Sequence, residues 1–387
     1  MNKKNQVPDR APHAVQGASA GKQPKKKKSG LMGRIVRRFF LLLFTVILLA
    51  FAALVLVMNL VFNGPSPAAR TQLTMSLIEA SATKWVPALF IGEEAVEEIR
   101  ASDKGAELKE EVTDTSQVVI NKDSAMTSNS DEWEKYPDGI RIESYSGDTY
   151  NAHIMIVKDP SQVYMGISTE KFSTSIPGKR LNAVIEEEGA LAAINAGAFN
   201  DDGTASASVG SCPLGLVMSG GKCVWTSGKQ PGLEGFAGFN TDNILVVSKT
   251  NLSQSEAEQL NIRDGCCFGP ALIINGEINM EAYNNNSGLN PRTAIGQRAD
   301  GAVIFVCIDG RQTSSMGGTY ADIIDIMVEY GAVNACNMDG GSSSIMYYRD
   351  TYGRYGEAGQ VQMINNYSLL QSQPRRMPNY WLVRAAE

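Results

Sequence analysis

The chain has 387 residues and a formal net charge of −6, which allows one large domain or two ordinary ones. The charge is unevenly distributed: residues 1–62 carry 11 Lys and Arg and one acidic residue, so the remainder carries a net −16. An acidic main part argues against nucleic acid as a partner, because phosphate binding needs a basic face.

The N-terminal third begins with a basic tail and an apolar segment. Residues 1–33 are rich in Lys, Pro and Gly and predict a disordered cytoplasmic tail. Phe39–Phe62 has no charge over 24 residues, enough at about 1.5 Å per residue to cross a bilayer. A cleaved signal peptide is the alternative, but its apolar region is usually about 7–15 residues long. We therefore predict a transmembrane signal anchor over residues 34–63.

The positive charges before the anchor predict its orientation. Arg34, Arg37 and Arg38 lie on its N-terminal side, and the positive-inside rule then places the N-terminus in the cytoplasm. The C-terminal part is predicted to be extracellular, at the cell membrane in a single-pass protein. We predict that residues 64–137 form a stalk. The apolar periodicity within 67–101 indicates an amphipathic helix, and the polar, acidic residues that follow indicate a linker.

Residues 138–387 predict the main domain, because short β-rich runs alternate there with Gly, Asn and Asp turns. Within it, the apolar run 302–308 ends at Asp309, a helix begins at Thr319, and a second apolar strand ends at Asp339. This β-α-β unit makes its two strands parallel, so both acids leave the carboxyl ends, where open sheets usually bind ligands. The predicted fold class is α+β, with a mixed β-sheet that contains this unit.

The side chains available limit the chemistry. The chain has only two histidines, His13 in the tail and His153 in a predicted strand. A Ser-His-Asp catalyst would have to use His153, and a His-rich zinc site lacks enough histidine ligands. We interpret His153 as a core or cross-strand residue. Carboxylate, guanidinium, amide and hydroxyl groups remain, and these suit sugar or phosphate-ester substrates.

Cysteines and metal ligands give weaker signals. Cys212 and Cys223 flank a predicted hairpin and an oxidising exterior would permit a disulfide, but buried free thiols are the favoured interpretation of the six cysteines. We predict no metal or other cofactor. Four residues could ligate a structural Ca²⁺ but lack the spacing of an EF-hand: Asn200, Asp201, Asp202 and Asp300. We favour the interpretation that they cap loops, and a Ca²⁺ site is the alternative.

Polar residues gather after or before four apolar runs of the main domain. They are Asn195 and Gly197 in AINAGAF, Arg292 in NPRTAIG, Asp309 and Arg311 in CIDGRQ, and Asp339, Gly340, Gly341, Ser342 and Ser343 in CNMDGGSSS. Each group alone is compatible with a polar turn. Two Asp-Gly pairs at the ends of one β-α-β unit, with two arginines nearby, favour a functional cleft.

These motifs, with GGTYADI between them, resemble the phosphodiester glycosidase family, which includes the lysosomal uncovering enzyme and bacterial exopolysaccharide-associated domains. The resemblance covers roughly residues 140–387. The family's acid-Gly-Gly-Gly run appears as Asp339-Gly340-Gly341-Ser342, with Ser342 in place of the third Gly, and its Asn-Gly-Gly-Phe-Phe appears as Asn195–Phe199. The resemblance implies a hydrolase that releases a sugar from a sugar-1-phosphodiester, and the anchor predicted from residues 34–63 would hold it at the membrane.

A mechanism follows from the resemblance. Asp339 and Asp309 share the acid–base or nucleophilic work at the anomeric carbon, with their individual roles open. Arg292 and Arg311 hold the phosphodiester. The other predicted substrate contacts are Asn195, Gly197, Gly340, Gly341, Ser342, Ser343 and Thr319. Two alternatives remain, a non-catalytic glycan-binding module and a scaffold in cell-envelope polysaccharide assembly.

Overall fold

The computed structural model describes residues 31–78, 83–101, 111–118, 133–200, 209–230, 233–285, 287–367 and 373–386. The chain divides into two compact units, Met1–Met58 and Asn59–Glu387. The predicted tail up to residue 30 lies outside the described residues, as do Asp201 and Asp202, two of the residues considered for Ca²⁺.

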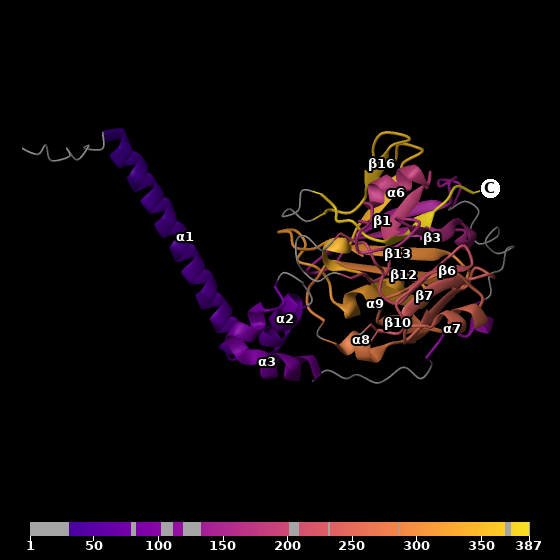
Figure 1. Ribbon diagram of the computed structural model, residues 1–387, viewed down its shortest axis with the longest axis horizontal. Helices are drawn as coiled ribbons and strands as arrows, with labels where there is room; N and C mark the ends of the chain where they lie inside the picture. Colours follow the sequence, from indigo (N-terminus) through magenta and orange to yellow (C-terminus); the bar gives the residue numbers. More distant parts are fainter. Residues whose placement is uncertain are drawn as a thin grey trace, which may run out of the picture. The chain divides into compact units, whose positions relative to one another are not determined.

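The first unit contains most of helix α1 (Leu31–Asn63), drawn in indigo in Figure 1. Within it, Arg34–Asn63 is long and apolar enough to cross a membrane, judged by length and composition. The predicted anchor is helical, as expected. A helix pairs its backbone N–H and C=O groups internally, which a segment in lipid requires. Its crossing of a membrane stays a prediction.

The second unit opens with two helices, α2 (Pro67–Ile78) and α3 (Val86–Ala101), where the sequence predicted one amphipathic helix. Gly92 interrupts α3 with φ 80° and ψ 158°, a conformation that glycine adopts without steric cost. Part of the predicted linker also packs on the β-structure, since Thr113 N–H donates to the carbonyl of Val247 at 2.9 Å.

Three antiparallel β-sheets form the rest of the unit. The seven-stranded sheet has the order β1 (Ile140–Ser146), β2 (Asn151–Val157), β13 (Val303–Ile308), β12 (Arg292–Arg298), β14 (Ala332–Met338), β10 (Ala271–Ile274) and β11 (Glu277–Ile278). The second sheet has the order β16 (Val361–Met363), β15 (Met346–Arg349), β4 (Ala192–Asn195), β17 (Asn379–Val383) and β3 (Val163–Ile167). The third has the order β6 (Lys222–Thr226), β5 (Leu216–Ser219), β9 (Ile262–Cys267), β7 (Phe236–Asn240) and β8 (Leu245–Ser248).

Short helices connect these strands. They are α6 (Leu181–Glu187), α7 (Gln254–Gln259), α8 (Met280–Asn284) and α9 (Tyr320–Glu329), with 3₁₀ turns η1 (Thr115–Gln117), η2 (Pro160–Gln162) and η3 (Gly341–Ser343). The predicted hairpin is β5–β6, and its turn residues Gly220 and Gly221 both have positive φ, as a tight hairpin turn requires. All six cysteines are free.

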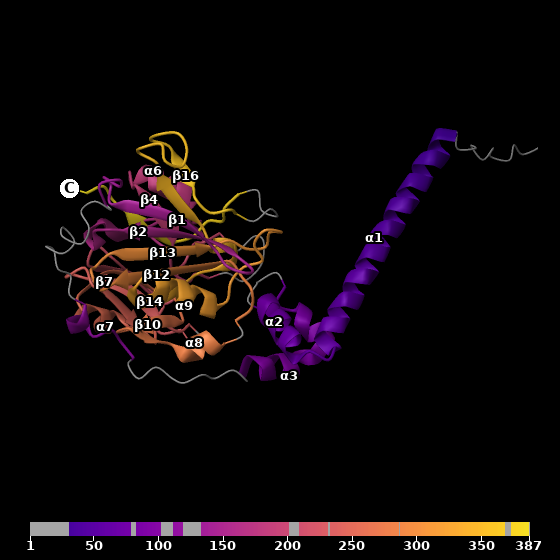
Figure 2. The ribbon, with the colours of Figure 1, turned by 180° about the vertical axis from the view of Figure 1, so that it is seen from behind.

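The predicted β-α-β unit is β13, α9 and β14, and the α+β class is confirmed. β13 and β14 run parallel, but β12 lies between them and is antiparallel to both (Figure 2). Ile308 lies opposite Arg292 and Met338 lies opposite Thr293, so both strands end at the start of β12. Two strand spacings separate the ends of β13 and β14 by about 10 Å.

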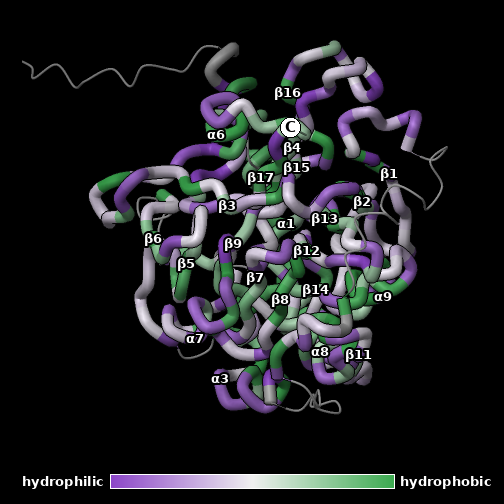
Figure 3. Tube along the Cα trace, turned by 90° about the vertical axis from the view of Figure 1, so that its right-hand side faces the viewer, coloured by the Kyte–Doolittle hydropathy of each residue, from purple (hydrophilic) through white to green (hydrophobic). Residues whose placement is uncertain are grey.

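The seven-stranded sheet is covered on both faces, which explains why β13 is continuously apolar. Along β13, Val303, Phe305 and Cys307 belong to the core shared with the other two sheets, whereas Ile304, Val306 and Ile308 belong to the core under α9. Helix α9 begins with the predicted capping box of Thr319 and Asp322. Figure 3 shows hydrophobic segments along the central strands and hydrophilic ones in the surrounding loops.

Candidate active site

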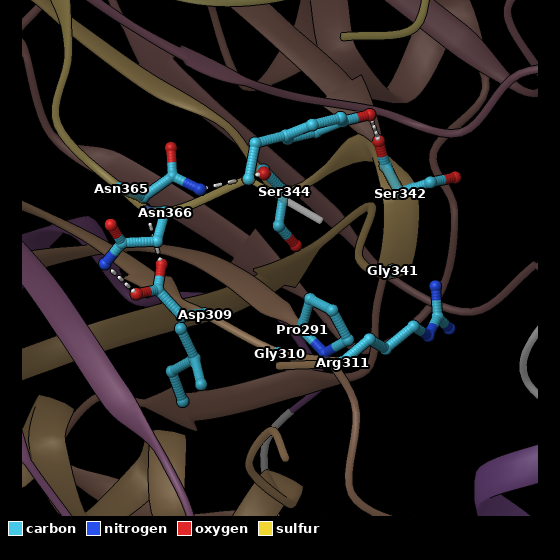
Figure 4. Close-up of a pocket in the computed structure, with 11 residues that line it drawn as sticks. Pro291, Asp309, Gly310, Arg311, Gly341, Ser342, Ser344, Asn365 and Asn366 are labelled. Carbon is cyan, nitrogen blue, oxygen red and sulfur yellow. Dashed lines mark hydrogen bonds between the residues drawn. The ribbon is translucent and has the colours of Figure 1, made fainter. Parts of the chain in front are cut away.

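A pocket lies where β13 and β14 end (Figure 4). Its lining comes from the end of β13, the η3 turn after β14, the residue before β12 and the segment after β16: Pro291, Ile308, Asp309, Gly310, Arg311, Gly341, Ser342, Ser344, Asn365, Asn366 and Tyr367. Four of the predicted site residues therefore line it, namely Asp309, Arg311, Gly341 and Ser342.

Asp309 is 2% exposed, and its carboxylate is held in place by hydrogen bonds. Oδ1 accepts the backbone N–H of Asn366 at 2.9 Å and Oδ2 accepts its side-chain amide at 2.8 Å. The Oδ2 atom also lies 3.2 Å from Nε2 of His153. These hydrogen bonds replace the hydration that the carboxylate group loses on burial.

His153 lies on β2 opposite Cys307 of β13, as the predicted cross-strand interpretation expects. Its contact with Asp309 adds a role that sequence reasoning missed. The contact joins residues 156 positions apart, and only the β2–β13 register brings them together. Sequence reasoning also missed three pocket residues that follow β16, namely Asn365, Asn366 and Tyr367. Their sequence, NNY, matches no functional motif.

Asp339 is half-buried and its backbone is fixed from β4. Its N–H donates to the carbonyl of Ala196 at 3.0 Å, and its own carbonyl accepts the Asn195 side-chain amide. Asn195 is fully buried, and its Oδ1 accepts both the Thr293 hydroxyl at 3.0 Å and the N–H of Ile345 at 3.1 Å. Asn195 thus positions the turn at Asp339 through its backbone.

The glycines after Asp339 allow two backbones to approach. The N–H of Gly341 donates to the carbonyl of Pro291 at 2.8 Å, and a Cβ on Gly340 would lie only 2.8 Å from that same oxygen. Gly341 has φ +61°, and a Cβ there would lie 3.6 Å from Nη2 of Arg311. Glycine is therefore favoured at position 340 by the close approach of the two backbones and at position 341 by its left-handed conformation.

The serines that follow have different environments. The Ser342 carbonyl accepts the Tyr367 hydroxyl at 2.6 Å, and its Oγ accepts from Nη1 of Arg375 at 3.1 Å. Burial raises the pKa of Tyr367, so its hydroxyl remains a donor at neutral pH. Ser343 and Ser344 are buried, with hydroxyl oxygens that have no hydrogen-bond partner in the described structure.

The two predicted phosphate-binding arginines differ sharply. Arg311 is exposed at the pocket, adopts a left-handed backbone with φ +58°, and donates from Nη2 to Oδ1 of Asn290 at 3.3 Å. Arg292 is 4% exposed and holds neighbouring loops. It donates to the carbonyls of Gly318 at 3.1 Å, Ser287 at 2.7 Å and Gly288 at 3.1 Å.

The remaining predicted contacts also have evident structural roles. Thr319 caps α9, and both its N–H and its hydroxyl donate to Asp322 at 2.7 Å. The N–H of Gly197 donates to Asn379 at 2.8 Å, and a Cβ on Gly197 would lie 2.9 Å from Cβ of Cys266. Within the described ranges, no group of three or more His, Cys, Asp and Glu residues could hold a metal ion.

Replacing Arg292 with Lys is expected to lower the free energy of unfolding by about 2 kcal/mol, because an ammonium cannot reach three carbonyls in the guanidinium's geometry. Thermal unfolding of the purified chain measures this loss. The matched control is Arg298→Lys at the other end of β12, where the guanidinium pairs with Asp300 at 2.9 Å and is partly exposed. Unchanged stability with a raised KM would instead make Arg292 a substrate ligand.

Comparison with known proteins supplies the family. The sequence profile of the phosphodiester glycosidase family matches residues 188–384, just over half of the chain. The SPbeta prophage-derived uncharacterized protein YomE of Bacillus subtilis is 26% identical over 191 residues, 48% of this chain and 27% of that protein. The N-acetylglucosamine-1-phosphodiester alpha-N-acetylglucosaminidase of Bos taurus is 28% identical over 213 residues, 48% of this chain and 38% of that protein.

Among solved structures, the catalytic domain of the zebrafish N-acetylglucosamine-1-phosphodiester alpha-N-acetylglucosaminidase, auto-inhibited by its pro-peptide, aligns with a TM-score of 0.49 and 20% identity. The alignment covers 64% of this chain and 82% of that domain. The chain spans only about a quarter to two fifths of the curated relatives it matches. The profile match covers β4, β12 to β15 and the pocket between them, and the chain belongs to the phosphodiester glycosidase family.

Proposed function

We propose that this protein hydrolyses sugar-1-phosphodiesters. Water replaces the phosphate at the anomeric carbon, so the free sugar leaves and the phosphate stays on its partner as a monoester. The observation that carries the proposal is a pocket lined by Asp309, Arg311 and the Gly341–Ser342 turn. Asp339 is not among the lining residues, but it directly precedes the Gly340-Gly341 turn, at the end of β14 on the same sheet edge as the end of β13. Family membership and the activity named for the bovine relative support it.

In this proposal the two aspartates have different tasks. Asp339 acts at the anomeric carbon, either as the nucleophile or as the base that activates water. Asp309 already accepts hydrogen bonds on both oxygens, so it suits the binding of sugar hydroxyls through its remaining lone pairs. A phosphate monoester is a weakly basic leaving group, and strong acid assistance is therefore unnecessary.

Arg311 is proposed to bind the phosphodiester. Its side chain is exposed at the pocket beside Gly341, and its guanidinium can form paired hydrogen bonds with phosphate oxygens. Arg311→Ala is expected to raise KM by about 10- to 100-fold, the equivalent of losing a hydrogen bond to a charged group. Initial-rate kinetics measure this change.

The control for Arg311→Ala is Lys222→Ala, which removes one positive charge from the exposed β5–β6 hairpin. Equal effects of the two substitutions would attribute the loss to the overall charge of the protein. An unchanged KM in Arg311→Ala would exclude Arg311 as the phosphate ligand.

The reaction is tested with the whole chain purified in detergent. It is incubated with nucleoside-diphosphate sugars and with sugar-1-(methyl phosphate) diesters, and both free sugar and phosphomonoester are quantified. Equal release of the two products supports the proposal. Glycan binding without any release would contradict it and favour the non-catalytic binding module.

We also propose that α1 anchors the catalytic domain outside the cell membrane, where it acts on cell-surface or exopolysaccharide glycans. The support is the apolar length of α1 and the +10 charge of residues 1–62 against −16 for the rest. Protease added to intact cells should then degrade the C-terminal domain and spare an epitope fused to the N-terminus. Protection of both ends would contradict this orientation.

A further inference from the structure

Helix α2 directly contacts a loop that lies beside the pocket, and this contact has no explanation in the proposed reaction. The hydroxyl oxygen of Ser76 accepts the N–H of Leu289 at 2.8 Å and donates to the carbonyl of Gln72, also at 2.8 Å. Two neighbours of Ser76 on α2, Thr74 and Met75, are at most 9% exposed. This side of α2 is therefore packed rather than solvated.

The backbone of the loop approaches α2 as closely as a glycine permits. Gly288 has φ +74°, and a Cβ there would lie 2.3 Å from the Ser76 nitrogen and 2.6 Å from its Cα. No other residue type fits this position without separating the helix from the loop. Gly288 and Ser76 thus form a specific contact, although they are more than 200 positions apart in the sequence.

The same loop supports both arginines near the pocket. The carbonyls of Ser287 and Gly288 accept from the buried Arg292. One residue beyond Leu289, Asn290 pairs in both directions with the backbone of Gly318, at 3.1 and 3.0 Å, and its Oδ1 accepts from Arg311 at 3.3 Å. A continuous series of contacts therefore leads from Ser76 through Leu289 and Asn290 to the guanidinium at the pocket.

We propose that Ser76 on α2 is a positioning residue for substrate binding, because it fixes the loop that orients Arg311. The proposal rests on the proposed function of the pocket. Since α2 begins four residues after α1 ends, the helix next to the predicted anchor is then a working part of the catalytic domain rather than a spacer. Removing the Ser76 hydroxyl should weaken phosphodiester binding and leave the bond-breaking step unchanged.

The test compares Ser76→Ala with the whole wild-type chain in detergent. We expect KM for a sugar-1-phosphodiester to rise by about 3- to 10-fold, the equivalent of one neutral hydrogen bond, with kcat and the melting temperature nearly unchanged. In an Arg311→Ala background, the same substitution should raise KM no further, because residues that act through one another are not additive. The matched control is Ser66→Ala, which removes a hydroxyl that caps the exposed start of α2.

Each outcome has a distinct meaning. Unchanged KM in Ser76→Ala, or an equal rise with and without Arg311, would overturn the positioning role. If the wild-type chain releases no sugar, the proposed function fails, and the inference is then tested by titration with inorganic phosphate and by hydrogen exchange of residues 287–290. Faster exchange together with weaker phosphate binding in Ser76→Ala would uphold the connection from α2 to Arg311, and the absence of either change would refute it.

Discussion

Asp339→Asn is expected to reduce the turnover of a sugar-1-phosphodiester by about 10³-fold or more, while the protein remains folded. The amide cannot serve as a nucleophile or a base at the anomeric carbon. The fold is preserved because Asp339 is held through its backbone, by the carbonyl of Ala196 and the side-chain amide of Asn195. Asn has nearly the same shape and keeps both bonds. Free-sugar release and thermal unfolding, measured on the same preparation, separate these effects.

The control for Asp339→Asn is Asp242→Asn, which neutralises an exposed acid in the β7–β8 turn. Wild-type turnover in that variant would show that net charge is not the cause of the loss. Retained turnover in Asp339→Asn would remove Asp339 from the reaction and leave Asp309 as the acid to examine. A large drop in melting temperature would instead show that the carboxylate stabilises the fold.

Asn195→Ala is expected to lower the free energy of unfolding by about 3–5 kcal/mol and to abolish activity at the same time. The side chain is fully buried and takes part in three hydrogen bonds, with Thr293, Ile345 and the carbonyl of Asp339. Its removal leaves those partners buried without compensation and frees the turn that carries Asp339. Denaturant unfolding followed by tryptophan fluorescence measures the loss, because Trp381 on the neighbouring strand β17 is fully buried.

Two further variants define what Asn195 does. Asn284→Ala removes an exposed amide from the end of α8 and should change stability by less than about 0.5 kcal/mol. Asn195→Asp keeps an acceptor for Thr293 and Ile345 but cannot donate to the Asp339 carbonyl, so it should lose activity as well as stability. A stable Asn195→Ala that loses activity would favour a direct substrate contact, and a stable and active one would contradict the positioning role.

Much of the fold could be predicted because its signals are local. The continuous apolar run of β13 indicates a strand buried on both faces, and Thr319 with Asp322 indicates the start of α9. The Gly220-Gly221 pair indicates the turn between β5 and β6. Each of these features depends on a few neighbouring residues, whose backbone preferences persist in the folded chain. The position of β12 between β13 and β14 could not be predicted, since strand order depends on pairing between distant segments.

The same distinction applies to the candidate site. By itself, the sequence determined that Asp309 and Asp339 follow two parallel strands and that glycines accompany the second acid, because strand ends and tight turns have local signatures. Only the tertiary structure decided that Arg311 faces the pocket while Arg292 holds loops, and that His153 and Asn366 meet at Asp309. Hydrogen-bond partners depend on which strands pair and in which register, and that choice is made by packing of the whole domain.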